Sequence, residues 1–137
     1  MIKIVNDELL IVKLSGICDA RALDMLGKEL NEIERTKTYV KRLVDVDDLQ
    51  GVTATSNDIM FYKKCRFEPA EKTATALCVR NDFQYGMARM FQSLVETDRH
   101  EIAIFRDIES AAHWLQVDSA LLKKDKHFAA DGFVRCR

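Results

Sequence analysis

A group of acidic and hydroxyl side chains between residues 45 and 56 is the part of this sequence most suited to chemistry. It holds three carboxylates and three hydroxyls, from Asp45, Asp47, Asp48, Thr53, Thr55 and Ser56. Close carboxylates are typical of divalent-cation sites, but a hard metal needs more oxygen ligands than one such loop supplies. We therefore expect no metal here. Asp45 is expected to brace neighbouring backbone, while Asp47 and Asp48 face water.

The hydroxyl groups of this loop have two interpretations. Thr55 and Asp58 have the spacing of a capping box, which predicts that a helix begins here with Thr55 or Ser56 as its N-cap. Alternatively, a phosphate on one of these hydroxyls would lie at a helix N-terminus and change the local surface charge. The whole group is therefore a candidate interaction surface and phospho-switch.

A second candidate site is apolar. Four large side chains, Phe83, Met87, Met90 and Phe91, recur at helical spacing. Such a stripe is the usual face that a helix turns to the core, but methionine also suits adaptable pockets, so these residues are candidate lining for a small apolar ligand.

Catalytic motifs are missing from the sequence. It contains no GxSxG, P-loop, GxGxxG or HExxH, and its three histidines do not fall at ligand spacing. Cys18 immediately precedes a predicted helix start, where a thiolate would be stabilised, so an enzyme that uses Cys18 or the acidic loop is a third interpretation. A packing role for Cys18 is favoured, and we predict no cofactor, no resident metal and no enzymatic activity.

Size and composition bound the class of protein. The chain has 137 residues, a net charge of -1 and a pI of about 6.3, which fits one domain and argues against nucleic-acid binding. No apolar run approaches the roughly 20 residues of a membrane span. The N-terminal MIKIVNDELL does not resemble a signal peptide, and the four cysteines form no CxxC pair. These features predict a cytoplasmic protein with cysteine thiols.

Residues 72–115 set the fold class, because they contain two successive strand–helix units. An apolar strand over residues 73–79 precedes a helix capped by Asn81, and a strand over residues 102–105 precedes a helix capped by Asp107. We expect Gln84 on the outer side of the first helix. Successive strands joined by helices are parallel, so this is an α/β protein.

The remaining elements extend this pattern. Residues 2–5 and 9–14 predict an antiparallel edge hairpin, with Gly16 ending its second strand. A helix is expected from Asp19 to about residue 35, a strand over residues 40–46, and a helix from Thr55 to about residue 65. Residues 117–137 form a C-terminal extension that is a short helix, an edge strand or a mobile tail. The prediction is a single domain with a mixed, mostly parallel sheet of about five strands and about four helices.

With these elements placed, residues 1–116 resemble the SpoIIAA-like group of small bacterial proteins, also described as STAS or CRAL-TRIO-like domains. The resemblance is carried by LVDVDDLQGV, FQYGMARMFQSLVE and above all IAIFRDIESAAHWL. It implies a mixed sheet with an edge hairpin. In STAS regulators a Ser or Thr at the start of the helix after the third strand is phosphorylated by a kinase that is also an anti-sigma factor, and the matching loop holds Thr53, Thr55 and Ser56. The CRAL-TRIO branch implies a lipid or other apolar ligand.

The leading hypothesis is a non-enzymatic regulatory or binding module of STAS type whose partner is another protein, kinase-like or regulatory. The alternatives are a carrier or sensor of a small apolar ligand, and an enzyme of unknown class. Edge strands and apolar tails invite pairing between copies, so a homodimer is also an expectation.

Overall fold

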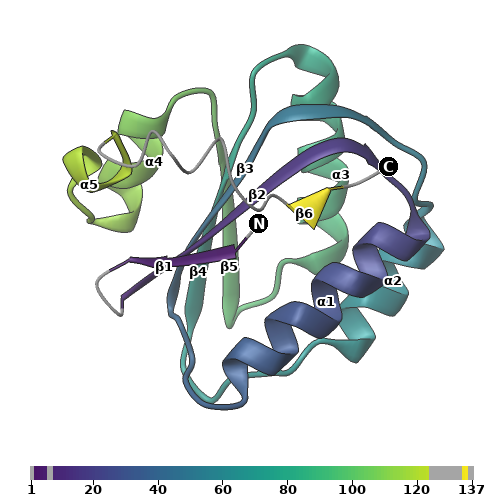
Figure 1. Cartoon of the computed structure of the whole chain (residues 1–137), viewed down its shortest axis with the longest axis horizontal. Coiled ribbons are helices and arrows are strands. Elements are labelled where there is room, and N and C mark those ends of the chain that lie inside the picture. The colour runs from purple at the N-terminus through teal and green to yellow at the C-terminus, as the bar shows by residue number, and fades with distance from the viewer. Residues whose placement is uncertain (1, 6–7, 124–133, 136–137) are drawn as a thin grey trace.

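A computed structural model describes residues 2–5, 8–123 and 134–135 of the chain (Figure 1). Its elements in chain order are β1 (Ile2–Val5), β2 (Leu9–Cys18), α1 (Ala20–Glu34), β3 (Lys41–Val52), α2 (Ser56–Cys65), β4 (Thr73–Cys78), α3 (Asp82–Val95), β5 (His100–Phe105), α4 (Ile108–Leu115), α5 (Ser119–Lys123) and β6 (Val134–Arg135).

One mixed sheet organises these elements, in the strand order β1-β2-β3-β4-β5. β1 pairs with β2 antiparallel, while β3, β4 and β5 continue the sheet in parallel. β6 adds a short parallel pairing to β2 at Leu14 and Ser15. The predicted α/β class and the five-stranded, mostly parallel sheet with its edge hairpin are confirmed. Beyond residue 116 the described elements are α5 and β6, and the domain boundary proposed there stays a prediction.

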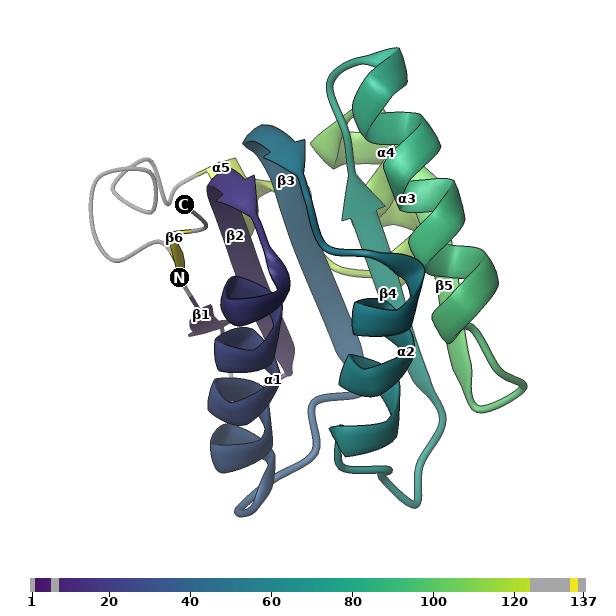
Figure 2. The same ribbon diagram turned by 90° about the vertical axis from the view of Figure 1, so that its right-hand side faces the viewer.

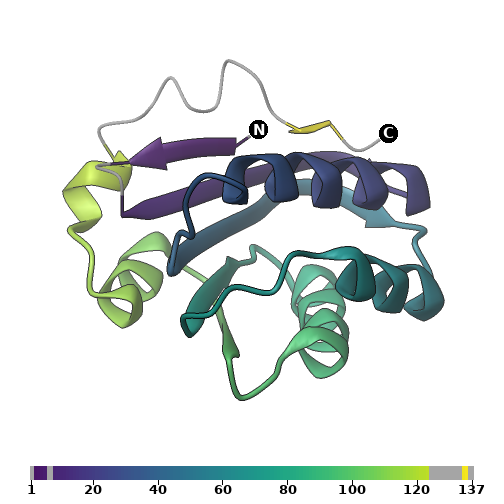
Figure 3. The same cartoon turned by 90° about the horizontal axis from the view of Figure 1, so that it is seen from below.

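The helices cover the two faces of the sheet unequally. Figure 2 shows α1, α2 and α3 in front of one face, while α4 packs against β4 and β5 on the other. Seen from below, α1 lies beside β2, while α3 lies on the same face toward the other edge of the sheet, near β5 (Figure 3). α2 packs mainly against α1 and α3 rather than against a strand. It therefore lies over the middle of the sheet and forms an outer layer, which we call the roof, across the gap between α1 and α3.

Gly27 sets how closely this roof approaches α1. A Cβ atom at Gly27 would lie 3.2 Å from Cδ2 of Tyr62 on α2, which is closer than ordinary van der Waals contact. Glycine is therefore the residue that lets the Tyr62 ring rest on the α1 backbone. The Tyr62 ring in turn meets the Phe91 ring of α3 at 6.0 Å between centroids, so Tyr62 bridges both neighbouring helices.

Three strands and one helix face differ from the sequence expectations. β2 continues to Cys18 instead of ending at Gly16, because Gly16 adopts a φ of 76° beside a register shift that absorbs the irregularity. β3 extends to Val52, and β5 begins at His100. On α3 the prediction for Gln84 is wrong, since its side chain is buried and that of Phe83 is 55% exposed.

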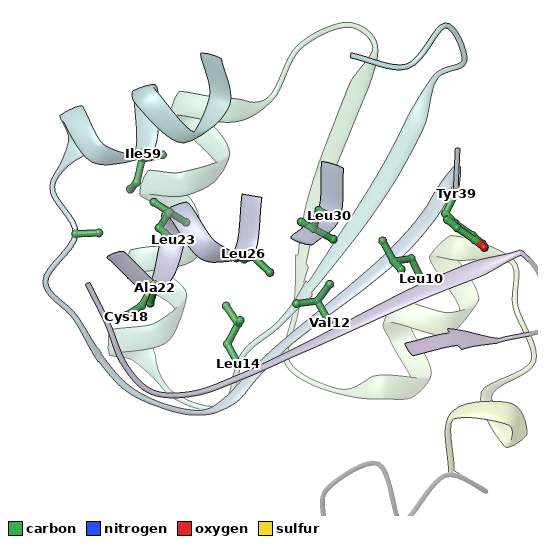
Figure 4. Close-up of a cluster of buried hydrophobic side chains, with 11 residues drawn as sticks. Leu10, Val12, Leu14, Cys18, Ala22, Leu23, Leu26, Leu30, Tyr39 and Ile59 are labelled. Atoms are coloured by element: carbon green, nitrogen blue, oxygen red, sulfur yellow. The ribbon is translucent and has the colours of Figure 1, made fainter. Parts of the chain in front are cut away.

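The core lies mainly between β2 and α1. Figure 4 shows Leu23, Leu26 and Leu30 of α1 beside Leu10, Val12 and Leu14 of β2, with Ile59 approaching from α2. Burial of these side chains is the main force that holds the α1 layer on the sheet. A separate cluster under α4 includes Leu43, Ala111 and Leu115.

Candidate functional site

The acidic residues predicted as a loop lie in β3, and basic residues neutralise them. Asp45 Oδ2 and Asp48 Oδ2 lie 3.8 and 3.3 Å from Lys13 Nζ. Arg80 pairs with Asp47 through two atoms: its Nε lies 2.8 Å from Oδ1, and its Nη2 donates to Oδ2 at 2.9 Å. Among the residues that the structure describes, no three His, Cys, Asp or Glu side chains are grouped to hold a metal ion. The three carboxylates therefore act as partners for cations of the chain itself.

Asp45 braces neighbouring backbone, as the sequence indicated. Its Oδ1 accepts a hydrogen bond of 2.9 Å from the Asp47 N–H. Burial raises the pKa of Asp45 above its ordinary value, while the Asp47 N–H and Lys13 oppose that rise. We infer a structural role for this carboxylate, because its lone pairs serve the strand on which it lies.

The hydroxyl groups lie at the N-terminus of α2, directly after β3. Thr55 is the N-cap of a complete capping box: its Oγ1 accepts from the Asp58 N–H at 3.2 Å, and Asp58 Oδ2 accepts from the Thr55 N–H at 2.8 Å. The predicted capping box is thus present, and the Thr55 hydroxyl is occupied by it. Thr53 and Ser56 flank this cap with exposed side chains. The structure brings these hydroxyls together at one accessible helix end, and their phosphorylation stays a prediction.

Gln84 links this region to α3, which the sequence did not reveal. Its Nε2 donates to the carbonyls of Asp47 and Leu49 at 3.1 and 2.9 Å, and its Oε1 accepts from the Arg80 N–H at 2.6 Å. With a relative exposure of 3%, it bonds to backbone groups of β3 and of Arg80, which precedes α3. Gln84 therefore holds the end of β3 against the start of α3.

A cavity of about 810 Å³ lies between the sheet and the three-helix layer. Its floor comes from the strands, with Leu10, Val12, Val44, Val46, Leu77 and Ile102. Its helical wall and roof include Leu23, Leu26, Ile59, Tyr62, Ala88 and Val95. The cavity exists because α2 rests on its neighbouring helices rather than on the sheet.

All four residues predicted as candidate apolar lining, Phe83, Met87, Met90 and Phe91, line this cavity. Met87, Met90 and Phe91 are partly buried, whereas Phe83 lies near the surface. Phe61 and Met60 of α2 and Phe67 beyond it also line the cavity and are exposed, Phe61 by 59%. Exposed aromatic side chains thus border a mostly apolar interior. Whether a ligand binds there stays a prediction.

One end of the cavity is polar, and it lies where β3, β4 and β5 begin. We call it the polar end and define it by Glu34, Arg42, Arg66, Thr73 and His100. All of these except Glu34 line the cavity. They come from five different elements or their caps, so no local sequence pattern shows them together. The sequence offers no signal that separates Arg42 from Lys41 beside it, since both are basic residues at the start of β3.

The two arginines of the polar end share a single carboxylate oxygen. Arg66 Nη2 donates to Glu34 Oε1 at 2.9 Å, and Arg42 Nη2 lies 3.0 Å from the same atom. The approach of Arg42 Nη2 does not satisfy hydrogen-bond geometry, so this buried nitrogen has no hydrogen-bond acceptor among the described residues. The other Glu34 oxygen, Oε2, is also buried and has no hydrogen-bond donor among them. Burial lowers the pKa of Arg42, against the attraction of Glu34, but a guanidinium remains charged.

Thr73 and His100 complete the polar end. Thr73 Oγ1 and His100 Nδ1 share a hydrogen bond of 2.5 Å. Burial and then the nearby Arg42 charge lower the pKa of His100 below its ordinary value, with Glu68 opposing them. The imidazole is therefore neutral near pH 7, and the fixed charges of the polar end are those of Arg42, Arg66 and Glu34.

The three cysteines that the structure describes give no sign of a reactive thiol. Cys18 is buried at the end of β2 and lines the cavity, and Cys78 is buried in β4. Burial, with a smaller contribution from Asp45, raises the pKa of Cys78 to about 12, which keeps it a thiol. Cys65 is exposed on α2. Cys136 lies outside the described residues.

Among the described helices, none combines the length and apolar character needed to cross a bilayer.

Comparison with known proteins bears on the fold. No protein-family model and no curated protein sequence matches the chain. Among solved structures, the chain is similar to an uncharacterised DUF3478-family protein with a SpoIIAA-like fold from Shewanella loihica PV-4. The similarity has a TM-score of 0.56 at 21% sequence identity, and it covers 84% of this chain and 90% of that one. The chain therefore has the SpoIIAA-like fold that its sequence motifs predicted.

Proposed function

We propose that this chain is a non-enzymatic binding protein of the cytoplasm that holds a small, largely apolar ligand in the cavity beneath α2. The observation that carries the proposal is the cavity of about 810 Å³, lined by Phe83, Met87, Met90 and Phe91. The proposal takes up the carrier hypothesis of the sequence, with the structure adding the volume and the walls.

The size and lining of the cavity support this function. Sites for small molecules usually enclose about 300–1,000 Å³ and have mainly apolar walls with a few placed polar groups. This cavity has apolar strand and helix walls and polar groups gathered at one end. Close packing is the rule in protein interiors, so an apolar space of this size between a sheet and its helices favours a binding site.

Native mass spectrometry of protein purified from its own source tests the proposal. We expect a mass increment that is lost on denaturation. Ala88→Phe places a ring inside the cavity, since Ala88 is buried on α3 and lines it, and this variant is expected to lose the increment. Ala20→Phe makes the same change at an exposed helix position and is expected to keep it. A bare chain in the wild type, under conditions that preserve the fold, would contradict ligand binding.

The second candidate is a protein-binding module switched by phosphorylation, with a kinase-like or regulatory protein as partner. It is supported by the exposed Thr53 and Ser56 beside the α2 N-cap. A phosphate-sized mass that survives denaturation and maps to residues 53–56 would favour this function. The same spectra give the number of subunits and so test the expected homodimer. If alanine at Thr53, Thr55 and Ser56 leaves all partner contacts unchanged, this surface is not the switch.

A further inference from the structure

The charges around the cavity do not balance. The charged side chains that line it are Arg42, Lys63, Lys64, Arg66 and Glu68, four basic and one acidic. Behind this lining, the buried Glu34 carboxylate offers one negative charge to both Arg42 and Arg66. Glu68 is exposed, so water screens its charge. The polar end therefore carries an excess of about one buried positive charge.

Arg42 is where this excess is concentrated. Its Nε donates to the Tyr39 carbonyl at 2.9 Å, which fixes the direction of the guanidinium. Its buried Nη2 has no hydrogen-bond acceptor among the residues described. A buried donor attached to a charged group is costly to leave unsatisfied, because water is lost without replacement. An acceptor that bears a negative charge would satisfy both the donor and the excess charge.

We propose that the ligand of the cavity is an unbranched apolar chain that ends in an anionic group, and that Arg42 binds this head group at the polar end. The chain then extends between the apolar sheet floor and the α2–α3 roof toward the exposed Phe61 and Phe83. Thr73 and His100 lie at the starts of β4 and β5 and supply further polar groups beside the head. This inference rests on the proposed ligand-binding function and names the chemistry of the ligand.

Three probes with the same apolar chain and different head groups test the inference on the full-length protein. Dodecanoate, dodecyl phosphate and dodecan-1-ol are titrated into ligand-stripped protein by calorimetry below their micellar concentrations. At least one anionic probe should bind about tenfold tighter than the alcohol, because a charge-assisted hydrogen bond contributes that much. The tighter of the two anions identifies the head group as carboxylate or phosphate.

Two variants at the polar end should change the affinity for the anionic probe in opposite directions. Arg42→Met should remove the preference for the anion and leave dodecan-1-ol binding, which also reports that the cavity is intact. Glu34→Gln removes the internal competitor for Arg42, so it should tighten anion binding without changing the affinity for the alcohol. Lys64→Met is the matched control, since Lys64 is an exposed basic residue on the lining, and it should keep the anion preference.

The outcomes separate this inference from the proposed function. Equal binding of all three probes to the wild type would overturn the anionic head group and leave an apolar-ligand protein. Binding of none of them would contradict the proposed function itself. Loss of anion preference in Lys64→Met, with its retention in Arg42→Met, would place the head group at Lys64 and overturn the assignment to Arg42.

Discussion

Gln84 is the residue whose role differs most from its sequence pattern. It follows Asn81 at a spacing typical of a helix start, and glutamine on a helix is usually exposed. Instead its amide serves one N–H and two carbonyls, and two of these groups belong to residues 47 and 49. A partner so distant in sequence leaves no periodic signal. The burial of Gln84 could therefore not be predicted, whereas the Asn81 cap next to it could.

Gln84→Met tests this brace. Methionine has a similar volume but cannot make these hydrogen bonds, so partly buried backbone bonds at Asp47, Leu49 and Arg80 are lost. We expect the free energy of unfolding to fall by about 2–4 kcal/mol, measured by urea denaturation. Gln50→Met, at an exposed position of β3, should stay within about 0.5 kcal/mol of the wild type. Equal stability of the two variants would show that the brace contributes nothing.

The lowered pKa of His100 predicts that the free energy of unfolding depends on pH. Its pKa is lowered in the folded chain, so the unfolded chain binds more protons as the pH falls below the ordinary value of 6.5. Stability contributed by neutral His100 is therefore full above that pH and is lost as the pH falls through the lowered pKa.

Urea denaturation at about pH 7.5 and about pH 5 measures this effect, because the loss of stability begins below the ordinary pKa of 6.5 and grows as the pH falls. The wild type should lose more stability between them than His100→Gln, which cannot be protonated. His113→Gln is the control, since His113 is exposed on α4, and it should behave as the wild type. An identical pH dependence in wild type and His100→Gln would exclude His100 as the group that titrates.

At the scale of elements, helix starts were predictable and strand ends were not. Asp19, Thr55, Asn81 and Asp107 each accept from the N–H three residues on, at distances between 2.7 and 3.2 Å. A cap joins neighbours in sequence, so the sequence contains the whole interaction. Strand ends depend on pairing with other strands. β2 passes Gly16 because β3 continues beside it, and no local pattern contains that information.

The sequence pattern of α2 also shows why its place was not predicted. The sequence predicted a helix here without saying which side is buried; Ile59 is its one buried position, and Phe61 is exposed. Lys63 Nζ donates to the Leu94 carbonyl of α3 at 3.2 Å, so part of what holds α2 is polar. A helix with so little buried surface opens more readily than its neighbours.

Thr55→Ala tests how far α2 depends on its cap. Loss of an N-cap side chain costs about 1 kcal/mol, and we expect faster amide hydrogen exchange confined to α2. Thr53→Ala removes a hydroxyl that does not cap the helix, so exchange there should match the wild type. Faster exchange spread evenly over α1 and α3 would show that α2 does not open as a separate unit.

At the scale of the whole molecule, the cavity follows from how three helices share one face of a sheet. α1 packs on β2, and α3 contacts β3 and β5. α2 then closes the space between them through Tyr62 and Ile59. The sequence predicted α1 to α4, and it named as candidate ligand lining four apolar residues of α3 that the structure places around the cavity. It did not predict the cavity or its polar end, because these depend on the spacing of elements that are far apart in the chain.

An occupied cavity should stabilise the entire fold. A ligand that binds only the folded chain at about 100 times its Kd adds about 2.7 kcal/mol, which for a domain of this size raises Tm by roughly 10 °C. We expect such a rise when submicellar dodecanoate is added to ligand-stripped protein in differential scanning calorimetry. Ala88→Phe, whose ring fills the same space, should show little rise. A lower Tm in the wild type would mean that dodecanoate prefers the unfolded chain, as a detergent does, and would contradict specific binding beneath α2.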